Sequence, residues 1–172
     1  MKILFTTLAA TLISQAVLAG PHEHGKAHLD IVVDPPAMAI SFRAPLASLI
    51  GFEHRPATAA EAARVQQLQK SLNQPERLIE LPSAADCSLS SVTTHAPFSA
   101  VPVKDENGST TSHADMEVEY QYVCANTAAL TRLSLPLFRE HPGIDHLELQ
   151  FLAPDRQHRL TLEADGADVT LP

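Results

Sequence analysis

The chain has 172 residues and a formal net charge of −8 at pH 7, because 20 Asp and Glu residues outnumber 12 Lys and Arg residues. An acidic chain without a basic cluster argues against binding to nucleic acid or to anionic lipid surfaces, and it favours cationic ligands. Nine histidines and two cysteines are the residues of most chemical interest.

The first 19 residues have the pattern of a secretory signal peptide. Lys2 precedes a short apolar run, and Val17, Leu18 and Ala19 form a small-residue cleavage pattern. The apolar run is too short and too polar to cross a bilayer. We therefore expect cleavage after Ala19 and an exported, soluble mature chain, residues 20–172, that does not insert into the membrane.

Histidines crowd the start of the mature chain. An amino-terminal copper or nickel clamp is excluded, because it needs an N–H at the second position and Pro21 has none. His22 and His24 are two residues apart, so on an extended backbone both rings point the same way, about 7 Å apart at Cα. That spacing lets two imidazoles bind one zinc, copper or nickel ion. Residues after a cleavage site are often mobile, so a tail without a metal site is the alternative.

The first half of the mature chain predicts a hairpin and one helix. Residues 27–34 alternate apolar and polar side chains, with His28 in the polar set, and residues 37–46 follow after a proline turn. Thr58 and Glu61 predict a capping box, which begins the one main helix over residues 58–73. An apolar stripe along this helix indicates a structural role in covering a sheet.

His54 closes the segment LASLIGFEHRP, where Pro45 can start a short helix and Pro56 limits its continuation. An imidazole in this surface loop is either a metal ligand or a histidine hydrogen-bonded to a carbonyl at a helix end. The local sequence does not separate the two interpretations.

The second half is more strongly β. Residues 87–96 and 112–124 flank a polar turn and predict an antiparallel pair, with Cys87 and Cys124 at the outer ends. Two cysteines in an exported chain predict one disulfide, while a pair of thiolate metal ligands is the less favoured alternative. Three further strands are predicted over residues 132–138, 145–154 and 156–164. The sequence thus predicts one α+β domain dominated by antiparallel sheet.

The predicted strand that contains HADMEVEY places one histidine and three carboxylates on a single face. This face is either a solvated sheet surface or part of a cation site. Three separate segments now offer imidazoles, so a four-ligand site is possible, with an acidic residue as substitute or outer ligand and one histidine in reserve. The candidates are His22, His24, His54 and His113, then Asp115, then His28.

Five segments, taken in order, resemble the ZrgA-type family of periplasmic zinc-uptake proteins. They are HEHGKAHLDI, APLASLIGFEHRP, LPSAADCSLSSV, HADMEVEYQYVCANTAAL and LFREHPGIDHLELQFLAP. The resemblance implies a periplasmic protein that binds Zn²⁺ as cargo and works beside an inner-membrane ABC transporter. It also implies that His22, His24, His54 and His113 occupy the family's recurring histidine positions.

One departure from the family concerns the segment before HAD, which in such proteins is often a long loop rich in histidine and acidic residues. Here it is VPVKDENGSTTSHAD, with His113 as its sole histidine. We therefore expect one compact zinc site rather than a loop that collects several ions.

Two other classes of function stay open. A zinc-dependent hydrolase could use Glu53 as a base beside His54, but the chain has no HExxH and no Gly-x-Ser-x-Gly motif, so no enzyme is predicted. The other class is an exported β-rich interaction module that binds no metal. A rise in melting temperature on addition of zinc would separate a metal-binding protein from such a module.

Overall fold

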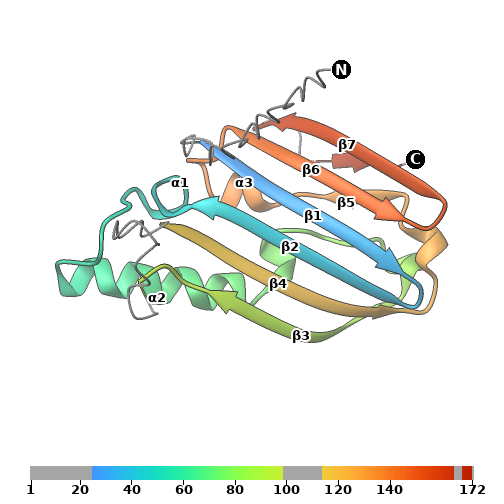
Figure 1. The fold of residues 1–172 in the computed structure, drawn as a ribbon, viewed down its shortest axis with the longest axis horizontal. Coiled ribbons are helices and arrows are strands. Elements are labelled where there is room, and N and C mark those ends of the chain that lie inside the picture. The colour runs from blue at the N-terminus through green and yellow to red at the C-terminus, as the bar shows by residue number, and fades with distance from the viewer. Residues whose placement is uncertain (1–24, 99–113, 165–167, 172) are drawn as a thin grey trace, which may run out of the picture.

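The computed structural model describes residues 25–98, 114–164 and 168–171. Six strands form one sheet in the order β3-β4-β2-β1-β6-β7, and β5 pairs with β8 in a small second sheet. Figure 1 shows the six strands as one layer, with the helices and the small sheet on its far side. The strands are β1 (Lys26–Asp34), β2 (Ala37–Pro45), β3 (Cys87–His95), β4 (Asp115–Cys124), β5 (Arg132–Ser134), β6 (His146–Ala153), β7 (Arg156–Glu163) and β8 (Asp168–Thr170).

The period-two alternation of the strands builds the core on one face of the large sheet. Leu29 and Ile31 of β1 and Ile40 and Phe42 of β2 are at most 1% exposed. Their neighbours along each strand point to the opposite face, which no described element covers. We call the first the covered face and the second the open face.

Helices and short 3₁₀ turns close the covered face. They are α1 (Leu46–Ile50), α2 (Ala59–Leu72), α3 (Leu137–Glu140), η1 (Pro75–Arg77), η2 (Ser83–Ala85) and η3 (Thr127–Ala129). The end of α2 packs over β4, where the Tyr120 hydroxyl donates a 2.6 Å hydrogen bond to the Leu72 carbonyl. Burial raises the pKa of Tyr120, so its hydroxyl remains a donor.

The predicted main helix is confirmed. Thr58 is its N-cap and Asn73 its C-cap, and Thr58 and Glu61 form the expected capping box. Leu68 and Leu72 are the buried members of the apolar stripe. In the described part of the chain, no helix is long and apolar enough to cross a membrane.

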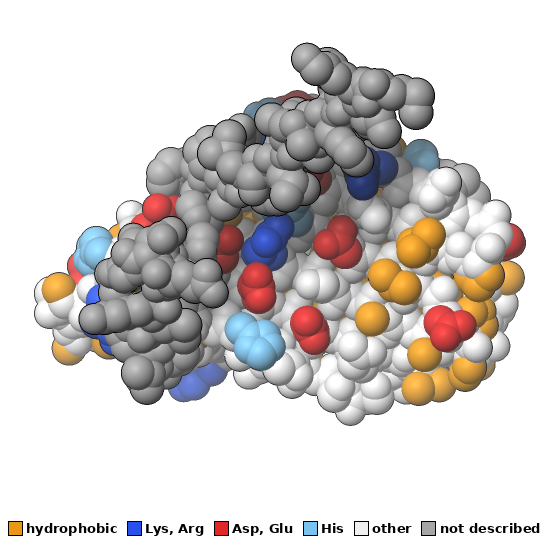
Figure 2. Space-filling view, viewed as in Figure 1, with side chains coloured by type: hydrophobic (Ala, Val, Ile, Leu, Met, Phe, Trp, Pro, Cys, Tyr) orange, Lys and Arg blue, Asp and Glu red, His pale blue; other side chains and the backbone are white. Residues whose placement is uncertain are grey.

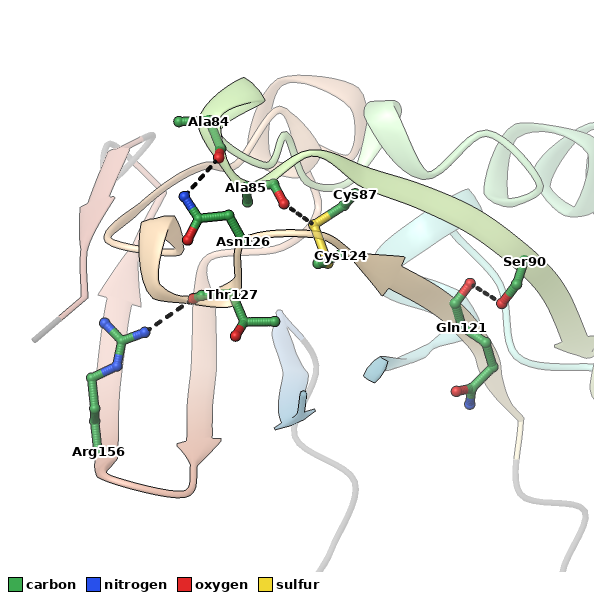
Figure 3. Close-up of a disulfide and its surroundings, with 9 residues drawn as sticks. All are labelled: Ala84, Ala85, Cys87, Ser90, Gln121, Cys124, Asn126, Thr127 and Arg156. Carbon is green, nitrogen blue, oxygen red and sulfur yellow. Dashed lines mark hydrogen bonds between the residues drawn. A yellow bond between two sulfur atoms is a disulfide. The ribbon is translucent and has the colours of Figure 1, made fainter. Parts of the chain in front are cut away.

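The predicted pair of strands around the cysteines is also confirmed. Cys87 lies opposite Cys124 in the β3–β4 register, and the two form a disulfide. The register shifts between Leu89 and Ser91, and the hydroxyl of Ser90 donates to the Gln121 carbonyl across this irregularity (Figure 3). The polar turn between the two strands lies outside the described residues.

The structure confirms the α+β class and the dominance of antiparallel pairing, with two differences in detail. Residues 132–138 were expected to form one strand, but β5 ends at Ser134 and α3 begins at Leu137. Pro136 explains the change, because proline cannot donate to a strand ladder and suits the start of a helix. In addition, β1 pairs in parallel with β6, a contact that the order of the strands along the chain does not reveal.

Candidate metal site

The topology gathers several described strand ends, which flank the segments of the predicted ligands in the sequence, at one end of the large sheet. Lys26 at the start of β1 lies opposite His146 at the start of β6, and Pro45 at the end of β2 lies opposite Asp115 at the start of β4. His95 at the end of β3 completes the edge. We call this edge the α1 end, because α1 follows directly from β2 there (Figure 1).

The backbone that leads to the amino-terminal histidines is fixed at the α1 end. The Gly25 N–H donates 2.9 Å to the hydroxyl of Ser48, which is only 5% exposed within α1. The Gly25 carbonyl accepts from the backbone N–H groups of Asp145 and His146, at 2.7 and 3.0 Å. Gly25 has φ +82°, a backbone conformation that residues with a Cβ rarely adopt, so the position favours glycine. His22 and His24 lie outside the described residues, but His24 is joined by a peptide bond to this anchored glycine.

His54 is exposed in the loop between α1 and α2. Its Nδ1 lies 3.0 Å from the Arg55 carbonyl, which can only accept, so Nδ1 carries the proton and Nε2 carries the lone pair of the neutral ring. Nε2 is 4.0 Å from Oε1 of Glu61, and the ring stacks on Phe52 with centroids 5.0 Å apart. This bond differs from the predicted alternative, a hydrogen bond to a carbonyl at a helix end, because Arg55 belongs to the loop between α1 and α2. In the neutral ring, it leaves Nε2 as the nitrogen that can bind a metal ion.

Glu61 connects this loop to the first turn of α2. Its Oε2 accepts from the backbone N–H groups of Ala57 at 2.7 Å and of Thr58 at 3.1 Å. The Ala57 N–H is the main cause that lowers the pKa of Glu61, so the carboxylate is ionised beside His54. Glu61, which was predicted from the sequence only as a capping residue, is thus also a carboxylate close to a predicted ligand.

The two ends of the undescribed segment 99–113 are both attached near α1. The guanidinium of Arg55 donates to the Phe98 carbonyl at 3.3 Å and lies over the Phe98 ring. On the other side, the Leu46 N–H at the start of α1 donates 2.7 Å to the Ala114 carbonyl. His113 lies outside the described residues and is bonded to Ala114.

Asp115 and His28 have different surroundings. Asp115 is half-buried and lines a hollow of about 410 Å³ together with Arg43, His95 and Glu117. His28 lies further along the open face, opposite Arg43 and 3.4 Å from the carboxylate of Glu148. Lys26 pairs with the same carboxylate at 2.9 Å, and this contact is the main cause that lowers the pKa of Glu148.

His95 is a further candidate, which was not among the ligands predicted from the sequence. It lies directly opposite Glu117 in the β3–β4 register and borders the same hollow as Asp115. The disulfide fixes the register of these strands, but the shift near Ser91 moves every later pair by one residue. A count from the cysteines without that shift would have missed the pairing.

Over the open face, charged side chains and histidines gather in the middle, while apolar side chains occupy the end away from α1 (Figure 2). Among the residues described, no group of three or more His, Cys, Asp and Glu side chains is arranged to hold an ion. The described part of the chain thus contributes anchored flanks, His54 and Asp115, and the remaining predicted ligands are His22, His24 and His113.

A family model described as ZrgA family zinc uptake protein matches residues 21–171. This match covers almost the whole chain and confirms the resemblance seen in the five sequence segments. No curated protein matches the chain.

Proposed function

Because the chain belongs to the ZrgA family of zinc uptake proteins, we propose that it is exported to the periplasm, binds Zn²⁺ there and passes it to an inner-membrane ABC transporter. Zinc is the cargo in this role, and no catalytic step is proposed. The residues proposed to bind it are His22, His24, His54 and His113, with Asp115 as substitute or outer ligand and His28 in reserve.

The observation that carries the proposal is the convergence of three chain segments at the α1 end. Gly25 is anchored to Ser48, Ala114 to Leu46, and the loop of His54 follows α1 directly. Residues 24 and 113 are each joined by a peptide bond to one of these anchored residues. Tetrahedral zinc is commonly bound by side chains from separate segments, with Zn–N distances of about 2.0–2.1 Å.

The chemistry of the region suits zinc better than calcium or magnesium. Imidazole nitrogen is a borderline ligand that zinc prefers, whereas the other two ions prefer oxygen. The Arg55 carbonyl orients the His54 ring. The side chain therefore loses less conformational entropy when it binds zinc. The acidic surface of the chain raises the local concentration of cations.

The experiment is a melting curve of residues 20–172 after chelation, with and without excess zinc. At zinc about 100 times above its Kd, the free energy of unfolding is expected to rise by about 2.7 kcal/mol, or roughly 5–10 °C in Tm. The double variant His24→Ala/His54→Ala is expected to lose this shift. The matched control His158→Gln, on β7 and away from the α1 end, is expected to keep it.

If zinc does not raise the Tm of the parent protein, an interaction module that binds no metal becomes the better interpretation. A shift that survives in the double variant would move the zinc site away from the α1 end. A zinc-dependent hydrolase would become the better interpretation if zinc at this site kept an exchangeable water as its fourth ligand.

A further inference from the structure

The two edge strands of the large sheet, β3 and β7, differ in how well they are protected from pairing with another chain. Every second residue of an edge strand points its N–H and C=O groups away from the sheet. In β3 the register shifts between Leu89 and Ser91, and such an irregularity hinders the addition of a further strand. In contrast, β7 pairs with β6 in one unbroken register from Arg156 to Glu163, without proline, and β6 is its only neighbouring strand among the described residues (Figure 1). The edge of β7 is therefore open to a further strand.

The side chains of β7 form a charged row on one face and an apolar row on the other. On the open face, Arg159, Thr161 and Glu163 are exposed. On the covered face, Leu160 and Leu162 pack against the core but are only half-buried. A strand added beside β7 would bury these two leucines further, and it would meet the charged row on the other face.

The two charged groups of this row have neighbours on β6 and can still bind a further partner. Nη2 of Arg159 donates 2.7 Å to Oε1 of Gln150, and Oε2 of Glu163 lies 3.0 Å from Nδ1 of His146. A guanidinium has five N–H donors and a carboxylate accepts several hydrogen bonds. Both groups can thus pair with an opposite charge across the free edge.

We propose that β7 pairs with β7 of a second copy of this chain, antiparallel, with Thr161 opposite itself on the two-fold axis. In this register Arg159 lies opposite Glu163 of the partner subunit, and symmetry repeats the ion pair on the other side of the axis. On the covered face, Leu160 lies opposite Leu162 of the partner subunit. Threonine, ion and apolar pairs of this kind are each favourable between antiparallel strands. The two large sheets then form one continuous sheet.

The charges of β7 favour this register over its neighbours. In a symmetric antiparallel pair one residue lies opposite itself, and like charges meet there if that residue is Arg159 or Glu163. With Leu160 on the axis, Arg159 lies opposite Thr161, and with Leu162 on the axis, Glu163 lies opposite Thr161. Among positions 159–163, only Thr161 on the axis brings each charge opposite its complement. This self-complementary spacing is the reason to assign the edge to a second copy, with backbone hydrogen bonds supplying affinity and charge supplying register.

The test is analytical ultracentrifugation of residues 20–172 after chelation. Pairing along one edge buries less surface than a standard interface of about 1,600 Å², so a weak dimer is expected, with a Kd of about 10–100 µM. Arg159→Glu and Glu163→Arg each place like charges opposite each other, and each is expected to weaken the dimer at least about tenfold. An equimolar mixture of the two variants is expected to regain the parent's affinity, because every charge then meets its complement on the other copy. The matched control Glu119→Arg reverses a charge on the open face of β4 and is expected to leave the Kd unchanged.

A parent protein that stays monomeric at about 1 mM overturns the proposal. So does a dimer that survives both charge variants, or a mixture of the two folded variants that stays monomeric. Melting curves show whether each variant folds. If either does not, Thr161→Lys decides: it puts two like charges on the axis, is expected to weaken the dimer at least about tenfold, and overturns the proposal if the dimer persists.

This inference does not rest on zinc uptake. None of the residues of β7 is a proposed zinc ligand, so the zinc affinity of Arg159→Glu and Glu163→Arg is expected to equal that of the parent. A monomeric parent would therefore leave the proposed function standing, and a protein that binds no zinc would leave the dimer standing.

Discussion

The two faces of the large sheet differ in what they contribute to the molecule. On the covered face, Leu29, Ile31 and Phe42 are at most 1% exposed and pack into one continuous core. On the open face, the neighbours of these residues along the same strands are charged near the α1 end, whereas Val32 and Val123 at the other end are 45% and 51% exposed. The same strands therefore supply a core to one side and a chemically varied surface to the other.

This difference separates the residues that stabilise the fold from those proposed to act. Burial of apolar side chains contributes about 25 cal/mol per Å², so the covered face supplies most of the free energy of folding. The α1 end is instead held by single hydrogen bonds, such as those of Gly25 to Ser48 and of Leu46 to Ala114. Exposed imidazoles can be placed there without loss of core packing.

The largest expected effect tests the covered face against the open face. Phe42→Ala removes a fully buried ring from β2 and is expected to lower the free energy of unfolding by about 3–5 kcal/mol, because it leaves a cavity. Glu119→Gln, on the open face of β4, is expected to change it by less than about 0.5 kcal/mol. Urea denaturation of both variants measures the two values. Similar losses in both variants would remove the distinction between the faces.

Much of the fold follows from local patterns, because those patterns have a single physical solution. Residues 27–34 can bury their apolar side chains only as a strand with these side chains on one face of the sheet. The structure has them buried on one face: Ala27, Leu29, Ile31 and Val33. The capping box at Thr58 fixed the start of α2 in the same way. The end of β5 at Ser134 has a local cause in Pro136, which the prediction of one strand over residues 132–138 overlooked. The parallel pair of β1 with β6 was not foreseen, because it depends on a contact between distant parts of the chain.

The candidate site could be predicted only as separate residues. The sequence gives no distance between His54 and the starts of β1 and β4, and only the strand order brings these segments to one end. The closeness of Glu61 to His54 has a local cause, since capping of α2 turns this carboxylate towards the loop.

A second prediction uses pH to distinguish the α1 end from the carboxylates of the open face. A histidine ligand must lose its proton before it binds zinc, and imidazole ordinarily titrates near pH 6.5. Zinc affinity is therefore expected to fall at least about a hundredfold between pH 7.5 and pH 5.5, since at least two imidazoles must deprotonate. Calorimetric zinc titrations at the two pH values measure this fall.

A zinc affinity that hardly changes with pH would instead assign zinc to the carboxylates of the open face. Carboxylic acids ionise near pH 4, so a site built from carboxylates alone would keep most of its affinity over the same range. An affinity that changes less than about threefold would thus remove histidine ligation. It would favour the acidic middle of the open face as the place where zinc binds.

The smallest expected effect concerns the hydrogen bonds that hold the loop of His54. Thr58 accepts from the Glu61 N–H at 3.1 Å, and Thr58→Ala is expected to lower the free energy of unfolding by about 1 kcal/mol. Thr58→Ser keeps the hydroxyl, so it is expected to retain most of the free energy of unfolding that Thr58→Ala loses. Zinc affinity is expected to weaken in Thr58→Ala and to recover in Thr58→Ser, because the cap keeps Glu61 and His54 in place. If the alanine variant lost stability but bound zinc as tightly as the parent, the loop would be ordered by zinc itself rather than by α2.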